Sequence, residues 1–153
     1  MTKYKNNIKN FKPRKNSKYH QGYVPQQLCT KLFTTTKNEP IIYRSGLELQ
    51  FIEFCENNPK VKKWASEPLS IKYFSRLDDK ECNYYPDYVI ETSDGNHIIV
   101  EIKPYEQTIK PDANDSKWLK EQWIKNTDKW HAATDFAHNH NAKFIIITEN
   151  FFR

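Results

Sequence analysis

The sequence has little cysteine, glycine or methionine: three Cys, three Gly and one Met in 153 residues. Cys29, Cys55 and Cys82 are odd in number and lack the spacing of metal ligands, so they indicate neither a disulfide framework nor a zinc site. The longest apolar runs, such as FIIIT and HIIVEI, fall far short of the roughly 20 residues that a membrane span needs. The N-terminus lacks the apolar stretch of a signal peptide. These absences predict a soluble globular protein in a reducing, cytosolic setting.

Acidic residues are missing from the first 38 positions, which hold nine lysines and arginines. The remainder has 15 basic and 19 acidic residues, a net charge of −4 within a chain of net charge +5. A basic arm on a mildly acidic body is a common feature of nucleic-acid-binding proteins, although a solvated leader without a partner has the same composition. We predict a basic arm over residues 1–38 and a single domain over 39–153. The arm's candidate DNA contacts are Lys12, Arg14, Lys15 and Lys18.

Beyond residue 41 the periodicity of apolar residues predicts alternating helices and strands. The expected order is helix, three strands, helix and strand, which makes an α/β domain with a mixed four-stranded sheet flanked by helices. The stretch from 115 to 140 reads as one or two helices, and its Trp123 and Trp130 predict a core stripe. The predicted elements are a helix over 45–58, strands over 68–75, 83–91 and 97–104, a helical stretch over 115–140 and a strand over 143–148.

Asp87, Glu101 and Lys103 are charged residues within apolar strands, where burial is costly without a partner or a metal. Glu101 and Lys103 are two apart, so both side chains leave the same face of the strand. A two-residue turn at 94–95 would point Asp87 to the opposite face. A three-residue loop with Gly95 in a left-handed conformation would pair residue 87 with 101 and bring all three together. The site hypothesis therefore predicts a loop with an odd number of residues.

Two carboxylates at this spacing can share a magnesium ion, which prefers oxygen ligands and keeps several waters. Such an ion polarises a phosphodiester and lowers the pKa of a bound water, and a neighbouring lysine can orient that water or stabilise the developing charge. The alternative is an exposed strand face with a surface ion pair worth about 0–1 kcal/mol.

Glu48 lies inside the apolar arc of the helix predicted over 45–58. The pattern Ser45-x-x-Glu48 is a capping box, in which Glu48 folds back onto the start of its own helix. Together with the two strand acids, it is also a candidate third carboxylate. Lys125 and Lys129 lie four apart on the last predicted helix, where they could reach DNA phosphates or face solvent.

A helix acid followed by Pro86-Asp87 and Glu101-x-Lys103 in an αβββαβ order resembles the PD-(D/E)xK nuclease superfamily. More narrowly, residues 41–150 resemble the head completion endonucleases of T-even-type tailed bacteriophages. The endonuclease subunit of cut-and-paste transposition systems, a TnsA-like core, is similar in the same region. The resemblance is carried by the ordered segments YRSGLELQF, NPKVKKWASEPLSIKY, YYPDYVI, VEIKPYEQT, KWHAATDFA and FIIITE.

This resemblance implies a restriction-endonuclease-like fold and a magnesium-dependent DNA endonuclease, with manganese as the alternative cofactor. Asp87 and Glu101 would hold the metal with the Ile102 backbone carbonyl, and Glu48 would be the helix carboxylate and a further candidate ligand. Lys103 would act on the water or the transition state, and Gln107 would help to line the DNA site. Head completion would place the protein in the host cytoplasm during assembly or in the virion, with portal or neck proteins as partners.

Two other functions stay open from the sequence. A virion protein that closes the head could bind the packaged DNA end without cutting it, although the intact Asp87, Glu101 and Lys103 count against this. A transposase-type endonuclease subunit would keep the chemistry but would depend on a partner protein for cutting.

Overall fold

The computed structural model describes residues 22–33 and 40–153, which form a layered α/β domain. The part of the chain it describes contains no helix with the length and apolar character needed to cross a membrane. In chain order the elements are β1 (Gly22–Val24), η1 (Gln26–Leu28), β2 (Ile41–Tyr43), α2 (Gly46–Asn57), β3 (Val61–Ser66), β4 (Ile71–Ser75), β5 (Lys80–Tyr84), β6 (Tyr88–Thr92), β7 (His97–Ile102), η2 (Tyr105–Thr108), α3 (Lys117–Asn139), β8 (Ala142–Ile147) and η3 (Glu149–Phe152).

The central sheet has four strands in the order β3-β6-β7-β8. β3, β6 and β7 pair antiparallel, whereas β7 and β8 pair parallel. Parallel neighbours need a crossover connection, and α3 supplies it between β7 and β8. The predicted mixed four-stranded α/β sheet is confirmed.

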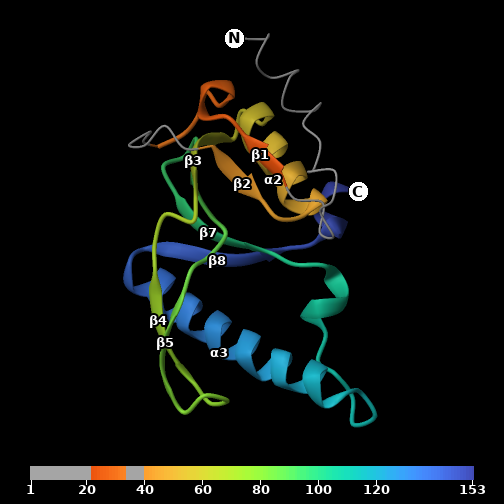
Figure 1. Cartoon of the computed structure of the whole chain (residues 1–153). Helices are drawn as coiled ribbons and strands as arrows, with labels where there is room; N and C mark the ends of the chain where they lie inside the picture. The colour runs from red at the N-terminus through yellow and green to blue at the C-terminus, as the bar shows by residue number, and fades with distance from the viewer. Residues whose placement is uncertain (1–21, 34–39) are drawn as a thin grey trace.

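The sheet separates two hydrophobic layers (Figure 1). On one side lie α2 and the β1–β2 pair, where Phe51 and Ile52 pack against Val100 and Ile102 of β7. On the other side lie α3 and the separate β4–β5 pair, whose core includes Ile99. Since neighbouring residues of a strand face opposite ways, β7 contributes to both layers.

Both long helices begin at a serine cap. Ser45 Oγ accepts a hydrogen bond from Glu48 N at 3.1 Å, and Ser116 Oγ accepts one from Leu119 N at 3.2 Å. These bonds satisfy N–H groups that the first turn of a helix leaves without a partner. α3 runs unbroken over its 23 residues, so the predicted stretch 115–140 is one helix.

The membership of the sheet differs from the prediction at two points. The segment predicted as a sheet strand over 68–75 contains β4, which pairs with β5 outside the central sheet. The predicted strand 83–91 divides at buried Pro86, which has no N–H for a ladder. The edge of the sheet is instead β3, which was not predicted. A register shift between Val61 and Lys63 leaves β3 without a clean alternation of buried and exposed residues.

The predicted boundary between arm and domain at residue 38 does not hold for the described residues 22–33. Val24 is fully buried in the core, and β1 pairs with β2. Buried Glu56 of α2 accepts hydrogen bonds from Thr30 N, Lys31 N and Trp64 Nε1. We call Thr30, Lys31, Glu56 and Trp64 the clasp. This segment has no periodic pattern of apolar residues, because polar contacts to distant residues hold it. The predicted arm contacts Lys12, Arg14, Lys15 and Lys18 lie outside the described residues.

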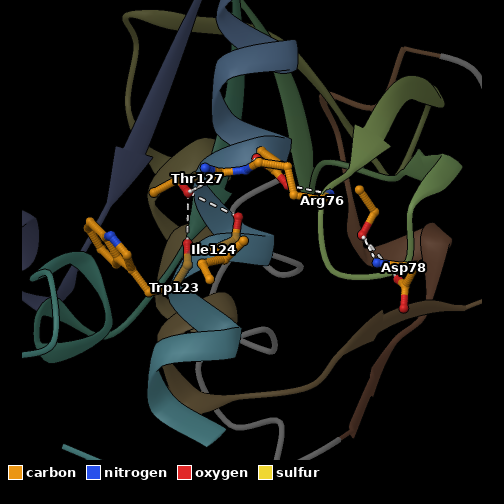
Figure 2. A network of polar contacts seen from close by, with 7 residues as sticks. Arg76, Asp78, Trp123, Ile124 and Thr127 are labelled. Atoms are coloured by element: carbon orange, nitrogen blue, oxygen red, sulfur yellow. Dashed lines mark hydrogen bonds and ion pairs between the residues drawn. The ribbon is translucent and has the colours of Figure 1, made fainter. Parts of the chain in front are cut away.

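An ion pair ties the turn between β4 and β5 to α3 (Figure 2). Asp128 accepts hydrogen bonds from Arg76 N at 3.0 Å and from Arg76 Nε at 2.7 Å. Thr127 Oγ1 accepts from Arg76 at 3.3 Å and donates to the Trp123 and Ile124 carbonyls. This clamp fixes the β4–β5 pair alongside α3, which matters because β5 ends at a residue of the site described next.

Candidate active site

The β6–β7 hairpin has the register that the site hypothesis requires. Its pairs run from Glu91 and His97 to Tyr88 and Val100, so the next position brings Asp87 opposite Glu101. Thr92 N donates to Asn96 O at 2.8 Å, which leaves residues 93–95 as the loop. Gly95 has φ +85°, the left-handed conformation that glycine adopts without strain. The predicted odd-numbered loop is confirmed.

The alternation of the two strands shows which face carries the acids. Val89 of β6 and Ile99 of β7 belong to the hydrophobic layer of α3. Asp87 and Glu101 lie two residues further along the same strands and therefore face the same way, and Lys103 continues that face. The three predicted residues thus converge between the sheet and the layer formed by α3 and β5.

Asp87 is fixed by the neighbouring strand. Its Oδ2 accepts a hydrogen bond from Ile102 N at 2.7 Å. Burial, followed by repulsion from Glu101 and Glu48, raises the pKa of Asp87 from 3.8 to about 8, although the Ile102 N–H and Lys103 act in the opposite direction. The site therefore disfavours a second negative charge unless a cation joins it.

Glu101 is buried and held from two sides. Its Oε2 accepts a hydrogen bond from the Tyr84 hydroxyl at the end of β5, and its Oε1 lies 3.8 Å from Lys103 Nζ. Burial raises the pKa of Glu101, while Tyr84, Lys103 and Lys129 oppose the rise. The pKa of Tyr84 is raised well above its ordinary value by burial and by Glu101, so Tyr84 acts as a hydrogen-bond donor.

Glu48 folds back on the start of its own helix, and its role as a third carboxylate for the metal stays a prediction. Its Oε2 accepts a hydrogen bond from Arg44 N at 2.8 Å, so the carboxylate folds back on the start of α2, one residue before the predicted capping-box partner. Burial raises the pKa of Glu48. Its charge also raises the pKa of both Asp87 and Glu101, so it lies within electrostatic range of the pair.

Two further cations border the acids. Lys129 of α3 lies 5.6 Å from the centre of the Tyr84 ring, and burial lowers its pKa while Glu101 and Asp87 raise it. Arg44 pairs with Glu67 at 2.5 Å. Burial works against the charge of Arg44, yet Glu67, Glu48 and Asp87 raise its pKa overall. Lys129 was a predicted DNA contact, which the structure places beside the acids.

Sequence reasoning did not identify Tyr84 or Arg44 as site residues. Tyr84 was assigned to the same strand as Asp87, and only the break at Pro86 lets it return from a separate pair of strands. Arg44 precedes a helix cap and carries no motif. Of the other predicted contacts, Gln107 lies in η2 and lines a cleft that begins at Lys103. Lys125 lies on α3 close enough to Lys129 to lower its pKa.

The donor set fits a hard divalent cation. For the described residues, the structure records one hydrogen bond to each acid of the pair, at Asp87 Oδ2 and Glu101 Oε2, so each keeps a second oxygen for a metal. No group of three His, Cys, Asp or Glu side chains within residues 22–33 and 40–153 makes a metal site by itself. Two carboxylates with waters, and with Ile102 O as a candidate, match magnesium better than a metal that needs an all-protein cage.

Comparison with known proteins identifies the family. Residues 58–149, which include Asp87, Glu101 and Lys103, match the family described as TnsA-like endonuclease N terminal. The chain is also 36% identical over 119 residues to the head completion nuclease of Enterobacteria phage T4, across 72% of this chain and 79% of that protein. Both matches agree with the restriction-endonuclease-like sheet and confirm the resemblance seen in the sequence. The chain belongs to the TnsA-like endonuclease family.

Proposed function

We propose that this protein is a magnesium-dependent DNA endonuclease whose metal is held by Asp87, Glu101 and the Ile102 carbonyl. The observation that carries the proposal is the hairpin register, which sets the half-buried Asp87 opposite the buried Glu101, with Lys103 on the same face. Each acid has a raised pKa because of burial, and a divalent cation would compensate the charge of the ionised pair. Manganese, which also prefers oxygen ligands, is the alternative ion.

The bound ion would polarise the scissile phosphate and provide a water of lowered pKa as the nucleophile. Tyr84 and Ile102 N hold the two carboxylates in place through their hydrogen bonds. Lys103 Nζ, half-buried beside Glu101, would orient the attacking water or stabilise charge on the phosphate oxygens. Glu48 supports the negative potential of the site from the start of α2.

DNA would be held mainly through its backbone. Lys129 on α3 lies near the acids, Lys125 lies near Lys129, and Gln107 in η2 lines a cleft with Lys103. The arm residues Lys12, Arg14, Lys15 and Lys18 would add positive charge. Contacts of this kind position a nucleic acid without specifying its bases. We therefore expect little sequence preference.

The relative from phage T4 carries the name head completion nuclease. We extend this role to the present chain and propose that it trims or finishes packaged phage DNA during head completion. Portal or neck proteins would then be its partners, and the host cytoplasm during assembly or the virion would be its location.

A cleavage assay tests this function. Supercoiled and linear DNA are incubated with wild type, Asp87→Ala or Lys103→Met, in magnesium, manganese or EDTA. We expect metal-dependent cutting by wild type and a loss of about 100-fold or more in each variant. Lys143→Met is the matched control, since this exposed lysine lies beside Ile98, at the far end of β7 from Glu101.

Retained cutting in Asp87→Ala or in EDTA would contradict the assignment of the metal site. If folded wild type binds DNA without cutting it under any of these conditions, the head-closing role without catalysis replaces the nuclease. Cutting that starts only after a second protein is added would favour the transposase-type dependence on a partner.

A further inference from the structure

We propose that the cleft between η2 and the first half of α3 binds one unpaired nucleobase next to the scissile phosphate. This inference rests on the proposed nuclease function and defines how its site receives DNA. The cleft has a volume of about 580 Å³, within the range of small-ligand sites. Lys103, the residue after β7, is among its lining residues, so the cleft adjoins the proposed catalytic lysine.

One wall of the cleft is aromatic. Trp118, in the first turn of α3, is 64% exposed, although a large apolar surface of this kind is costly to leave in water. Trp123 lies one and a half turns further and also lines the cleft. Its ring packs edge-on against Trp130, with 5.9 Å between centroids and an interplanar angle of 86°. Trp123 thus joins the core stripe predicted from the sequence to the wall of the cleft.

Contacts on the opposite side of α3 fix the position of this wall. Figure 2 shows Trp123 on the side of α3 opposite to Arg76, whose contacts with Asp128 and Thr127 hold the helix against the β4–β5 pair. A stacking surface that is already in place loses little conformational entropy when a planar ring binds. The part of the wall that Trp123 forms is therefore in place before a planar ligand binds.

The polar groups of the cleft match the edge of a base. Gln107, Gln122 and Asn126 bring three carboxamides to it, each with both donors and an acceptor. These are the groups that base edges present in return, and unpaired bases are recognised by stacking together with such hydrogen bonds. An apolar side chain of a protein partner would leave the three carboxamides without hydrogen-bond partners, so the lining favours a nucleobase.

Two amines in the lining fit a nucleotide chain. Lys103, whose Nζ lies 3.8 Å from Glu101 Oε1, and Lys110, which follows η2, both line the cleft. Positive groups of this kind can pair with the phosphates that flank a bound base. Asp115 also lines the cleft, but its Oδ2 is engaged by Asp112 N at 2.8 Å within the preceding loop. Glu106 adds an exposed acidic group at the same wall.

Binding of a short single strand tests the proposal. A fluorescently labelled five-residue oligothymidylate is titrated with the full chain in EDTA, and a five-residue backbone of the same charge without bases serves as the comparison probe. Wild type should bind the probe with bases more tightly. Trp118→Ala should weaken its binding about fivefold to a hundredfold, the effect of losing one base–aromatic stack, and leave the baseless probe unchanged.

Two variants guard against indirect effects. Trp118→Tyr keeps a stacking ring and should restore most of the affinity. Phe74→Ala removes an aromatic side chain that is 57% exposed on β4, away from the cleft, and should change neither affinity. Thermal unfolding of each variant confirms that it is folded.

Equal affinity of wild type for the two probes would overturn the proposal. So would a Trp118→Ala effect that is the same for both probes, or no effect at all, and the apolar wall would then be assigned to a protein partner. Because binding is measured in EDTA, it does not depend on catalysis. If the protein cuts DNA but shows no base-dependent binding, the nuclease function stands and base binding in the cleft is wrong. If it shows base-dependent binding but does not cut DNA, only the nuclease function is wrong.

Discussion

Glu56 and Glu101 are both buried carboxylates, yet their surroundings differ in how many donors face them. Glu56 is fully buried, and its two oxygens accept from Thr30 N at 2.7 Å, Thr30 Oγ1 at 3.0 Å, Lys31 N at 3.2 Å and Trp64 Nε1 at 2.7 Å. Glu101 accepts from the Tyr84 hydroxyl alone among the described residues, and Lys103 is 3.8 Å away. A second carboxylate, that of Asp87, stands opposite it.

The comparison teaches how the same chemical group serves the fold in one place and a site in another. At the clasp, four donors compensate the desolvation of one charge, so the carboxylate joins residues 22–33 to α2 and β3. Lys31 Nζ strengthens this connection by donating to the carbonyls of Cys55, Asn58 and Val61 near the end of α2. At the hairpin, two carboxylates face each other with few donors, so the deficit can be met by a cation.

The largest effect should come from breaking the clasp. Glu56→Ala leaves the buried Trp64 Nε1 and two backbone N–H groups without their acceptor, so we expect a loss of about 3–5 kcal/mol in the free energy of unfolding. Denaturant unfolding followed by circular dichroism measures it. Glu121→Ala is the control, because its pair with Lys117 is exposed and worth at most about 0.5 kcal/mol. A loss below about 1 kcal/mol in Glu56→Ala would remove the clasp's structural role.

Removing a carboxylate from the acid pair should have the opposite effect on the free energy of unfolding and stabilise the protein. The pKa of Asp87 is about 8 in the folded protein against an ordinary 3.8, so folding favours the protonated form. Without metal, wild type should lose stability as the pH rises from about 4 through about 8. Asp87→Asn avoids that loss and keeps an oxygen for the Ile102 N–H.

The two proteins are compared by unfolding in EDTA across this pH range. Asp87→Asn should be more stable than wild type at pH 8 by at least about 1 kcal/mol, with the difference vanishing below about pH 4. Asp94→Asn changes an exposed carboxylate on the same hairpin and serves as the control. A wild type as stable as Asp87→Asn at pH 8 would mean that the pair is not strained by its own charge.

The smallest expected effect concerns the turn that creates the acid pair. Gly95→Ala places a side chain at φ +85° and should cost about 1–2 kcal/mol. Gly46→Ala, in the first turn of α2 with open space where the new Cβ would lie, should be neutral or slightly stabilising. If Gly95→Ala is as well tolerated as Gly46→Ala, the left-handed loop does not control the register that brings Asp87 to Glu101.

The site was more predictable from the sequence than the clasp, for a physical reason. Asp87, Glu101 and Lys103 lie on two strands joined by a short hairpin, so their relation depends on local rules of alternation and loop length. The sequence allowed two registers, and the structure selects the one with Gly95 left-handed. The family resemblance supplied the roles of these residues, which spacing alone did not establish.

The rest depends on contacts between distant segments. Tyr84 reaches Glu101 only because β4 and β5 form a separate pair that the clamp between Arg76 and Asp128 holds alongside α3. Likewise, Glu56 joins Thr30 to Trp64 across 26 and 8 residues, and the segment 22–33 that contains Thr30 shows no periodic pattern. Such polar networks have no sequence period, so apolar alternation did not reveal them.

A crystal structure of wild type grown with manganese is the most direct test of the central claim, because anomalous scattering locates this ion unambiguously. We predict one manganese within about 2.0–2.3 Å of an oxygen of both Asp87 and Glu101, and its absence from Asp87→Asn crystals grown alike. An ion bound elsewhere in a wild type that cuts DNA with manganese, or equal density in both proteins, would contradict the assignment of this hairpin as the catalytic metal site.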